Sequence, residues 1–287
     1  MVLKKEHFSD IRVSWQPKEQ LLPEIAAKLN IGLDHVVFVD DSPIECGRVA
    51  ESHPGVTVIQ LPQQPECYVD ALLEDGLFDT LSITAEDLRR GDLYKQRDQA
   101  EMLRAESGSL EEFYRKLGTE VEIAPVDKAS LARAAQMTQK TNQFNTTTIR
   151  FTEAEIARRL ADPDWVCATV RVKDRFGDSG ITGLMMAHAE PDRVEIETFL
   201  LSCRVIGRGV ETAMLASLGA KARARRMDRI SGKITPTKKN IPVRGLYSDH
   251  GFDRATQNAD SEPSLWSLDV GKKDIVVPDW ISVVDRT

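Results

Sequence analysis

Apolar positions near the N-terminus follow first a helical and then a strand period. Residues 18–29 have the spacing of a helix, and residues 35–39 form an uninterrupted apolar run that ends in Asp40 and Asp41. A short helical stretch follows, and residues 56–60 form a second apolar run. Runs of this kind are typical of the interior of a parallel sheet, so the pattern predicts a strand, helix, strand unit of α/β architecture.

Between residues 83 and 118 the pattern changes to long helices of nearly balanced charge. Thr84 with Asp87, and Ser109 with Glu112, have the spacing of capping boxes that open helices. Such a stretch is typical of a solvated connecting helix pair, so we place the domain boundary there. The expected organisation is an N-terminal domain over 1–80, a helical connector over 81–118 and a C-terminal domain over 119–287.

The C-terminal part alternates between the two periods in another order. One strand is followed by two helices, the second opened by a capping box at Thr152 and Glu155. Three consecutive strands come next, and Gly177, Gly180 and Pro191 interrupt them as hairpin turns do. The predicted strands are 120–124, 165–172, 181–188, 194–201, 229–235 and 265–268, and the predicted helices are 127–140, one beginning at 152, 209–225 and 242–248.

The composition is that of an ordinary globular chain of about two domains. Of the 287 residues, 41% are hydrophobic and 29% are charged, and no window approaches the roughly 18 apolar residues of a membrane span. The 45 acidic and 38 basic residues give a net charge of -7, which disfavours nucleic acid as a partner. The N-terminus has no apolar signal segment, so we expect a cytoplasmic protein.

The four cysteines are too few for a disulfide framework and form no Cys-x-x-Cys pair. We expect Cys46, Cys67, Cys167 and Cys203 to be reduced thiols. Cys203 precedes Arg204 at a predicted helix start, where a thiol ionises more easily and can carry an acyl group. A buried structural thiol is the alternative for this residue.

Residues 203–210 read Cys-Arg-Val-Ile-Gly-Arg-Gly-Val and lie where a predicted strand ends and a helix begins. Gly207 and Gly209 allow backbone N–H groups to approach a phosphate, and the helix N-terminus adds favourable dipole charge. Arg204 and Arg208 add formal positive charge. The stretch therefore predicts a phosphate-binding loop, with a purely structural glycine turn as the alternative.

Downstream residues extend this pattern, because Asn240, Tyr247 and the pair Gly251-Phe252 follow. Together with the order of elements, they make the region 119–268 resemble the GNAT acyltransferase fold, which implies that the glycine loop binds the pyrophosphate of a cofactor. In such folds a late Tyr protonates a leaving thiolate, and Tyr247 occupies that position. A phenol with a pKa of about 10 can donate in this way, and packing at a helix end is the alternative.

Three further groups have both a functional and a structural interpretation. Glu195 and Glu197 lie on a strand that can offer a general base, although exposed strand faces commonly carry acids. The amides around Asn142 suit either a substrate clamp or a helix cap and turn, and we include Asn142 and Asn240 among the cofactor-binding candidates. The basic run over 221–229 suits an acidic carrier protein or a cofactor phosphate, but also a solvated helix face.

Asp40 and Asp41 follow the first apolar strand, where side chains at the carboxyl edge of a parallel sheet face a ligand. Paired carboxylates suit Mg²⁺, which prefers one or two of them together with phosphate oxygens. With Trp15-Gln-Pro-Lys18 upstream, residues 38–43 resemble the third and fourth motifs of the haloacid dehalogenase (HAD) superfamily. The resemblance implies that Lys18 contacts a phosphoryl group and that the two acids hold magnesium; a structural Asp-Asp turn is the alternative.

The joint pattern resembles the FkbH-like family over nearly the whole chain. Its further motifs are Lys-Thr-Asn-Gln-Phe-Asn at 140–145, Arg-Phe-Gly-Asp at 175–178 and Phe-Leu-Leu-Ser-Cys-Arg at 199–204. The resemblance implies a partial HAD-like parallel sheet segment over 1–80 followed by a GNAT-like domain. It also implies an enzyme of polyketide-type biosynthesis, in which a glyceryl group from 1,3-bisphosphoglycerate, a phosphorylated three-carbon acid, becomes a thioester on the phosphopantetheine of an acyl carrier protein.

One HAD motif is missing, because no Asp-x-Asp occurs before Lys18. Residues 1–79 also have too few strands for a doubly wound sheet. Three explanations are open: the intact protein has an upstream segment, which we favour, a separate polypeptide supplies it, or the phosphoryl step has been lost. We expect this chain alone to hydrolyse no phosphate ester.

The sequence thus predicts an FkbH-like acyl transfer protein with Cys203, Tyr247 and Lys18 as its catalytic residues. A conventional GNAT enzyme that takes its acyl group from coenzyme A is the first alternative. A docking module for a carrier protein, without turnover of its own, is the second.

Overall fold

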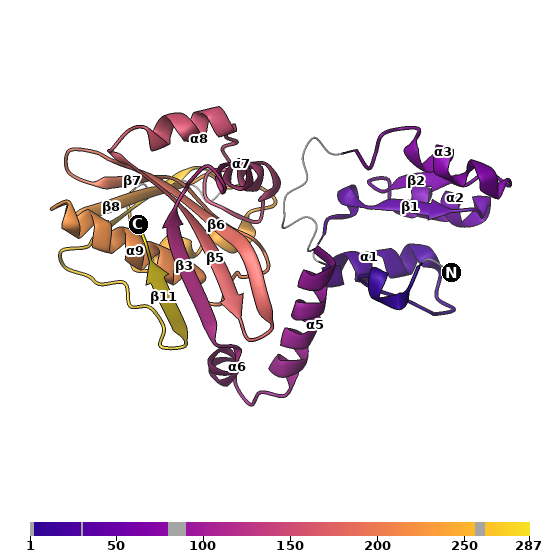
Figure 1. Ribbon diagram of the computed structural model, residues 1–287, viewed down its shortest axis with the longest axis horizontal. Coiled ribbons are helices and arrows are strands. Elements are labelled where there is room, and N and C mark those ends of the chain that lie inside the picture. Colours follow the sequence, from indigo (N-terminus) through magenta and orange to yellow (C-terminus); the bar gives the residue numbers. More distant parts are fainter. Residues whose placement is uncertain (1–2, 30, 80–89, 256–261) are drawn as a thin grey trace. The chain divides into compact units, whose positions relative to one another are not determined.

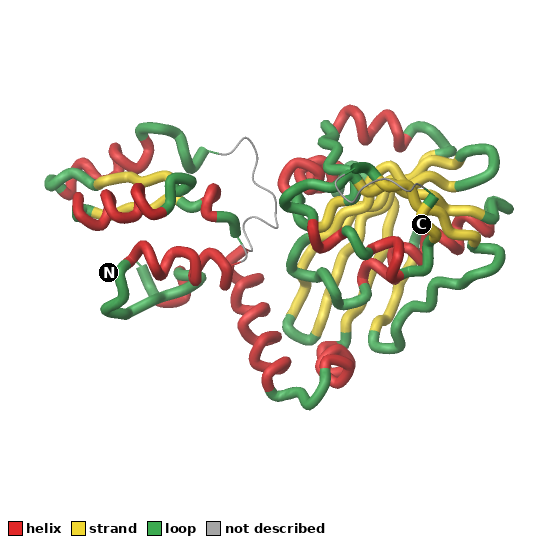
Figure 2. Tube along the Cα trace, turned by 180° about the vertical axis from the view of Figure 1, so that it is seen from behind, coloured by secondary structure: helices red, strands yellow, loops and turns green. Residues whose placement is uncertain are grey.

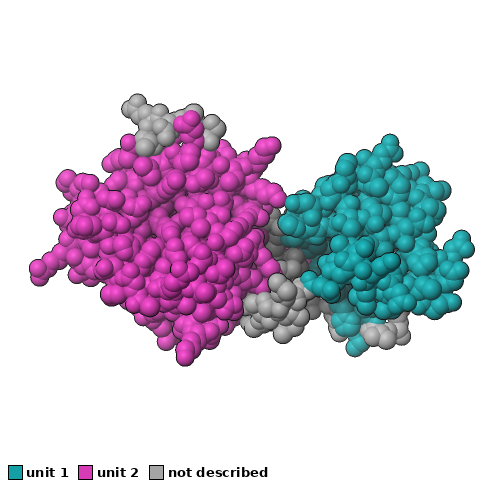
Figure 3. Space-filling model, turned by 90° about the horizontal axis from the view of Figure 1, so that it is seen from above, with its two compact units in different colours: residues 1–95 teal, residues 96–287 magenta. Residues whose placement is uncertain are grey.

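The computed structural model describes residues 3–29, 31–79, 90–255 and 262–287. They form two compact units, residues 1–95 and residues 96–287, which Figure 3 shows in different colours. Each unit has hydrophobic clusters of its own. Among the helices of the described ranges, none is both long and apolar enough to cross a membrane.

The N-terminal unit is built around two parallel strands joined by a helix. β1 (Val37–Asp40) and β2 (Thr57–Gln60) pair in register, and α2 (Pro43–Ser52) connects them (Figure 1). α2 begins here because Ser42 caps it by accepting a hydrogen bond from the Glu45 N–H, and Pro43 suits its first position. This is the unit that the apolar runs predicted.

Apolar residues from these elements form a small core. Its buried members are Phe38, Cys46, Val49 and Val56. The other elements of the unit are η1 (Lys5–His7), α1 (Lys18–Leu29), η2 (Leu33–His35), η3 (Pro65–Cys67) and α3 (Tyr68–Leu73).

The C-terminal unit is built on one mixed sheet, nine-stranded in the described residues. Its strands are β3 (Thr119–Pro125), β4 (Phe144–Asn145), β5 (Trp165–Asp174), β6 (Gly177–Ala189), β7 (Val194–Leu201), β8 (Arg229–Ile234), β9 (Asp253–Arg254), β10 (Ser264–Asp269) and β11 (Ile281–Asp285). They follow the order β11-β3-β5-β6-β7-β8-β10-β9, and β4 pairs with β7. The β3–β11 and β7–β8 pairs are parallel and the others are antiparallel.

Helices cover both faces of this sheet (Figures 1 and 2). On β6, Leu184 and Met186 pack with α7 (Leu131–Lys140) and α8 (Glu153–Leu160), whereas the alternate residues pack with α9 (Val210–Ala224). A strand buried on both faces needs apolar side chains at successive positions, and this explains the unbroken apolar runs in β6 and β7. The remaining helices are α5 (Arg90–Ala105), α6 (Leu110–Leu117), η4 (Ile241–Val243) and α10 (Leu246–Asp249).

β7 and β8 separate after a short parallel pairing. They pair only from Val194 opposite Ile230 to Ile196 opposite Gly232. On the other side of β7, the neighbouring β6 residues Met186 and Ala187 lie opposite Thr198 and Ile196 of β7. Glu197, between these two, has no partner on β6 and is therefore an extra residue. An extra residue of this kind is a β-bulge, which bends its strand away from its neighbour.

The opening between β7 and β8 is closed by another part of the chain. β4 pairs Phe144 with Leu201 and Asn145 with Leu200. The next residue, Thr146, donates its N–H to the carbonyl of Phe199 at 3.1 Å and accepts from the N–H of Thr235 at 2.7 Å. Residues 144–146 therefore act as a strand between the two diverging ones.

The α/β fold class expected from the sequence is confirmed, and the long C-terminal elements follow the predicted order. Ser109 caps α6 as its spacing predicted, by accepting a hydrogen bond from the Glu112 N–H. The second predicted cap, at Thr84 and Asp87, lies outside the described residues. The sequence did not predict β4, β9 or β11.

The packing of β6 makes a substitution at Gly183 costly. A Cβ there would lie 2.8 Å from a methyl of Leu201 and 2.9 Å from the Cβ of Val170. We expect Gly183→Ala to lower the free energy of unfolding by about 1–3 kcal/mol, because the core must be overpacked. Urea denaturation of the full chain measures this change.

Gly219→Ala is the matched control, because the nearest atom to a Cβ there is 3.8 Å away and the residue lies inside α9. Replacing a helical glycine at an open position should stabilise the unit by up to about 1 kcal/mol. Equal effects of the two substitutions would contradict the packing described for β6.

Candidate functional site

The loop between β7 and α9 has the backbone that its glycines predicted. Gly207 and Gly209 have φ values of +74° and +90°, which side-chain-bearing residues rarely adopt. A Cβ at Gly209 would also lie 2.8 Å from Ile281 and 3.2 Å from Pro278, so only glycine fits there. Gly209 is the N-cap of α9 and offers no side chain, which leaves the N–H groups of the first turn to other acceptors.

Aromatic side chains hold the carbonyl groups of this loop. The Tyr114 hydroxyl donates to the Gly207 carbonyl at 2.5 Å, and the Trp280 indole N–H donates to the Arg208 carbonyl at 3.2 Å. The Tyr114 and Trp280 rings are stacked, with centroids 5.6 Å apart. The conformation of the loop is therefore fixed from outside by α6 and by the segment before β11.

The two loop arginines contact protein groups. Arg208 Nη1 lies 3.0 Å from Asp174 Oδ2, and the Asp174 side chain is only 8% exposed. Arg204 Nη2 lies 3.5 Å from the Ser179 carbonyl. Both were predicted to add charge for a phosphate, but the charge of Arg208 is already neutralised by a carboxylate of the chain.

Cys203 is exposed at the point where β7 runs into this loop. Cys67, in the N-terminal unit, is also exposed, whereas Cys46 and Cys167 are buried. Burial raises the pKa of the Cys167 thiol to about 12 and also raises that of Cys46. Of the two cysteines in the C-terminal unit, Cys203 is therefore the one that a substrate can reach.

Glu211, which the sequence interpretation did not single out, lies in the first turn of α9 next to the loop. Its Oε2 is buried and has no hydrogen-bond partner. Burial raises the pKa of this carboxyl, while the backbone N–H groups of Glu211, Gly209 and Gly207 oppose that rise. An acid two residues after Gly-x-Gly is the signal that could have indicated it.

Tyr247 is fully buried in α10, between Phe252 and Trp266. Burial raises its pKa well above the ordinary value, and the hydroxyl has no hydrogen-bond partner among the residues that the structure describes. A Cβ at Gly232 would lie 2.2 Å from the Tyr247 oxygen, so the missing side chain of Gly232 makes room for the phenol. In this conformation the hydroxyl packs against β8, and its role as a proton donor stays a prediction.

The two asparagines assigned to cofactor binding make contacts within the chain. Asn240 is fully buried: its amide donates to the carbonyls of Asn145 (3.1 Å) and Thr235 (2.9 Å) and accepts from the Thr237 N–H (2.7 Å). The amide oxygen of Asn142 accepts a hydrogen bond from Arg150. The geometry favours the cap-and-turn interpretation of this region over a substrate clamp.

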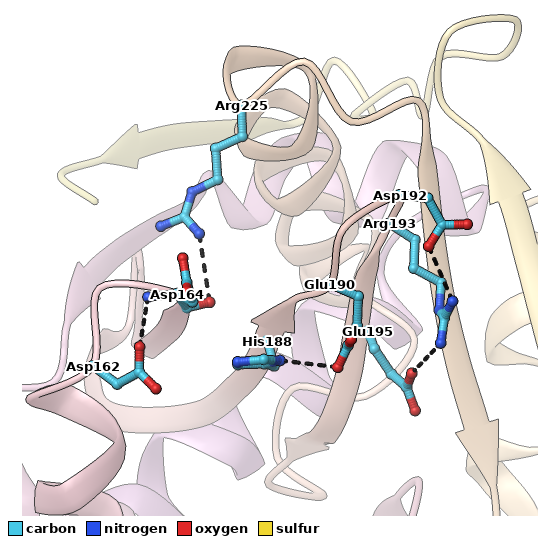
Figure 4. A network of polar contacts seen from close by, with 8 residues as sticks. All are labelled: Asp162, Asp164, His188, Glu190, Asp192, Arg193, Glu195 and Arg225. Carbon is cyan, nitrogen blue, oxygen red and sulfur yellow. Dashed lines mark hydrogen bonds and ion pairs between the residues drawn. The ribbon is translucent and has the colours of Figure 1, made fainter.

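The two acids on β7 also have cationic partners. Glu197, at the bulge, binds Arg159 through both oxygens at 2.8 Å. Glu195 lies 3.1 Å from Arg193, which also contacts Asp192 in the turn before β7 (Figure 4). Both carboxylates are thus engaged by arginine side chains, and this arrangement does not support a general base on β7.

The basic run at the end of α9 ties the helix to its surroundings. Arg225 donates to the carbonyl of Pro163 at 2.9 Å and reaches Asp164 (Figure 4). Lys221 pairs with Asp285 at 3.5 Å, and Arg223 pairs with Asp274 at 3.0 Å. These contacts favour a structural role for the first part of the run.

In the N-terminal unit, the structure brings Lys18 and Asp40 together. Lys18 Nζ lies 2.5 Å from Asp40 Oδ2, and Asp40 Oδ1 accepts from the Ser42 N–H at 2.9 Å. Burial has the largest single effect and raises the pKa of Asp40, but the hydrogen bonds from Lys18 and the Ser42 N–H, together with the charge of Lys18, bring the pKa below its ordinary value. Asp41 is exposed beside this pair.

Magnesium would find two carboxylates here, Asp40 and Asp41. Lys18 already neutralises one of them, so binding needs further oxygen ligands from a phosphate or from water. No group of three or more His, Cys, Asp or Glu side chains that could hold a metal occurs among the residues that the structure describes.

No protein-family model and no curated protein matches this chain. Among solved structures, it is similar to the ribosomal-protein-S18-alanine N-acetyltransferase of Escherichia coli, with 13% identity and a TM-score of 0.40 over 52% of this chain and 94% of that chain. It is also similar to Mycobacterium smegmatis RimJ in complex with CoA-disulfide, with 16% identity and a TM-score of 0.39 over 52% of this chain and 82% of that one.

A third similarity is of a different kind. The N-terminal part of a Bacteroides fragilis protein, containing a phosphatase domain complexed with Mg, is 41% identical with a TM-score of 0.28. The match covers 29% of this chain and only 22% of that chain. GNAT acetyltransferases and one phosphatase-containing protein are thus among the structural neighbours, and we take no site residue from them.

The burial of the four thiols predicts two classes of reactivity. We expect Cys67 and Cys203 to react with a disulfide reagent at neutral pH at least about 100-fold faster than Cys46 and Cys167, because burial keeps the reagent from these two thiols and raises their pKa. Spectrophotometric thiol counting on the folded chain should give two fast equivalents. Cys67→Ser and Cys203→Ser should each remove one, and a fast class that survives both changes would contradict the assignment.

The Lys18 contact predicts a change in the titration of Asp40. In Lys18→Met the pKa of Asp40 should rise, because burial then acts without the ammonium that opposes it. A depressed carboxylate pKa stabilises the fold above the unfolded-state pKa, and this contribution is lost as the pH falls through the folded-state pKa. NMR titration of the Asp40 carboxyl carbon measures the shift.

Lys28→Met serves as control, because Lys28 pairs with Asp10 at 2.9 Å instead. It removes the same charge from the same unit and should leave the titration of Asp40 unchanged. An equal shift in both variants would show that net charge, not the Lys18 contact, sets the pKa of Asp40.

Proposed function

We propose that this chain transfers an acyl group to the phosphopantetheine thiol of an acyl carrier protein, with Cys203 as the thiol that carries the group in between. The observation behind this proposal is the exposure of Cys203 at the start of a rigid glycine loop in a GNAT-like unit. The FkbH-like resemblance of the sequence supplies the finer assignment. The group is of glyceryl type and comes from a phosphorylated three-carbon acid, 1,3-bisphosphoglycerate.

The proposed transfer has two acyl-exchange steps, both at the Cys203 sulfur. The Cys203 thiolate attacks the acyl carbon of the acyl phosphate, the bond from that carbon to the phosphate oxygen breaks, and phosphate leaves with the electron pair. The thiolate of the carrier then attacks the new thioester and releases Cys203 as a thiolate. No oxidant or reductant is required.

A fixed loop supports this role for Cys203. Tyr114 and Trp280 hold the carbonyls of the next residues, and Phe199 and Leu201 are pinned by residues 144–146. A nucleophile whose backbone is held on both sides loses little conformational freedom when it reacts. Exposure of the sulfur leaves room for a pantetheine arm to approach.

Within the N-terminal unit, Lys18, Asp40 and Asp41 are assigned to binding of a phosphorylated three-carbon acid. Lys18 is a cation suited to a phosphate oxygen, and Asp40 with Asp41 would hold Mg²⁺ once that phosphate adds its oxygens. When bound, the metal would neutralise part of the charge of that phosphate. We therefore assign substrate binding to this unit.

The burial of Tyr247 favours a second candidate, a carrier-docking module without turnover. In this conformation Gly232, Phe252 and Trp266 enclose the Tyr247 hydroxyl, so it is not placed to give a proton to a leaving thiolate. The mechanism above needs no such donor, because the carrier thiolate displaces Cys203 as a thiolate. A covalent intermediate therefore separates the two candidates.

Intact-protein mass spectrometry tests this proposal. The full chain is incubated with 1,3-bisphosphoglycerate and magnesium, with and without a phosphopantetheinylated carrier protein. We expect a glyceryl increment on the chain, mapped to Cys203, that moves to the carrier. Cys203→Ser should lose at least about 100-fold in loading rate, as expected when a nucleophile is removed.

Cys67→Ser is the matched control, since it removes the other exposed thiol and should retain both steps. Carrier loading that persists at the wild-type rate in Cys203→Ser would exclude the covalent intermediate. No increment on either protein with the wild-type chain would leave the docking module as the better proposal.

A further inference from the structure

The loop that follows β8 is positively charged, although the chain as a whole is acidic. From the start of β8 to Ser248 every charged residue is Lys or Arg, whereas the net charge of the chain is -7. Lys238, Lys239 and Arg244 lie in residues 235–244, which we call the basic loop, and all three are exposed. Charge of one sign that is concentrated on one part of a surface attracts a partner of the opposite sign.

Carboxylates of the described ranges do not neutralise Lys238 or Arg244. In the basic run at the end of α9, by contrast, Lys221 and Arg223 each pair with an aspartate. Arg244 donates to the carbonyl of Thr237 at 3.0 Å, and Lys238 makes no ion pair within the described ranges. Both cations therefore keep their charge available for a partner.

The backbone of the basic loop is held by a buried side chain. The amide of Asn240 donates to the carbonyls of Asn145 at 3.1 Å and Thr235 at 2.9 Å. Its oxygen accepts from the N–H of Thr237 at 2.7 Å, and the Thr237 hydroxyl accepts from the N–H of Lys239 at 3.3 Å. A surface that is formed in advance loses little conformational freedom when a partner binds.

An exposed apolar side chain lies between the lysines and Arg244 in the sequence. Ile241 is 64% exposed, whereas Val243 of the same short helix η4 is buried. Protein interfaces combine apolar side chains with a charged rim, whereas nucleic acids are bound mainly through charge and hydrogen bonds to phosphate. Ile241 together with the cations therefore favours a protein with an acidic surface as the partner.

The basic loop leaves the sheet at the same edge as the segment that carries Cys203. β7 and β8 are parallel neighbours (Figure 1), and Cys203 follows the carboxyl end of β7 as the basic loop follows that of β8. Thr146 joins the two ends by bonding to Phe199 and to Thr235. The thiol of a carrier protein lies at the end of a flexible arm, so the carrier can dock beside the sulfur that its thiol approaches.

We propose that the basic loop is the docking surface for the acidic face of the carrier protein, with Ile241 as its apolar contact and Lys238, Lys239 and Arg244 as its charged contacts. The inference rests on the proposed acyl transfer, which supplies the carrier as partner, and it adds where the carrier binds. Complementary charges of this kind steer the approach of a partner and fix its orientation.

Biolayer interferometry with the full chain and an acidic acyl carrier protein, the one used in the loading assay, tests this inference without an acyl donor. The carrier is used with and without its phosphopantetheine. We expect the double variant Lys238→Glu, Lys239→Glu to bind both forms at least about tenfold more weakly than the wild type, because like charges then face each other. Binding of the wild type should weaken as the salt concentration rises, since salt screens exposed charges.

The double variant Lys4→Glu, Lys5→Glu is the charge-matched control, because these adjacent exposed lysines lie in the N-terminal unit. It changes the net charge of the chain by the same amount and should bind the carrier as the wild type does. Ile241→Ser leaves the charge unchanged and should weaken binding at least about threefold through loss of the apolar contact. Circular dichroism and thermal unfolding check that each variant is folded.

Equal weakening by the two double variants would overturn the inference, because net charge alone would then explain the effect. Weakening confined to the carrier with its arm would overturn it as well, since the lysines would then contact the phosphate of the arm and not the face of the protein. Tighter binding of a DNA oligonucleotide than of the carrier would identify a nucleic-acid surface instead. Absence of carrier binding by the wild type would also exclude the proposal.

These outcomes are separate from those of the proposed acyl transfer. If charge reversal in the basic loop weakens carrier binding while the wild-type chain loads no carrier, the docking surface stands and the transfer fails. If the wild-type chain loads the carrier and charge reversal leaves binding unchanged, the transfer stands and the carrier docks elsewhere.

Discussion

The separation of β7 from β8 is the constraint on which the C-terminal unit depends. The bulge at Glu197 ends their pairing, and buried backbone groups beyond it must find other partners. Thr146 supplies them, by bonding to Phe199 on one strand and Thr235 on the other. The buried amide of Asn240 completes the junction. Polar residues that look in sequence like ligand-binding groups are thus required to close the sheet.

The pairing of residues 144–146 with β7 also determines which side chain is exposed at the end of this strand. Because the strand is paired up to Leu201, the chain leaves the sheet at a defined point, and Cys203 follows there with its side chain exposed. Beyond it, Tyr114 and Trp280 hold the loop carbonyls. Exposed sulfur on fixed backbone is the arrangement that a nucleophile requires, and it arises from contacts between segments far apart in the sequence.

Periodicity was sufficient to predict the long elements but not the short or long-range ones. β6 and α9 each contain enough apolar positions to reveal their period, whereas β4 has two residues and no period to detect. β11 pairs with β3, although most of the unit's sequence separates the two strands. The burial of Tyr247 could not be predicted either, because it depends on the missing side chain of Gly232 on another strand. Motif reasoning placed the loop glycines correctly and missed the buried acid Glu211 in the next helical turn.

Gly207 and Gly209 can therefore have either of two roles: they can join β7 to α9, or they can bind an anion. A Gly-x-Gly turn is needed wherever a chain passes from β7 into α9 with positive φ and close contact at Gly209, whether or not an anion binds. Glu211 lies in the first turn of α9 with one carboxyl oxygen buried, so an acid of the chain itself is next to this turn. A sequence motif indicates the backbone conformation of its segment, and the charge of the neighbouring side chains decides which ligand that backbone binds.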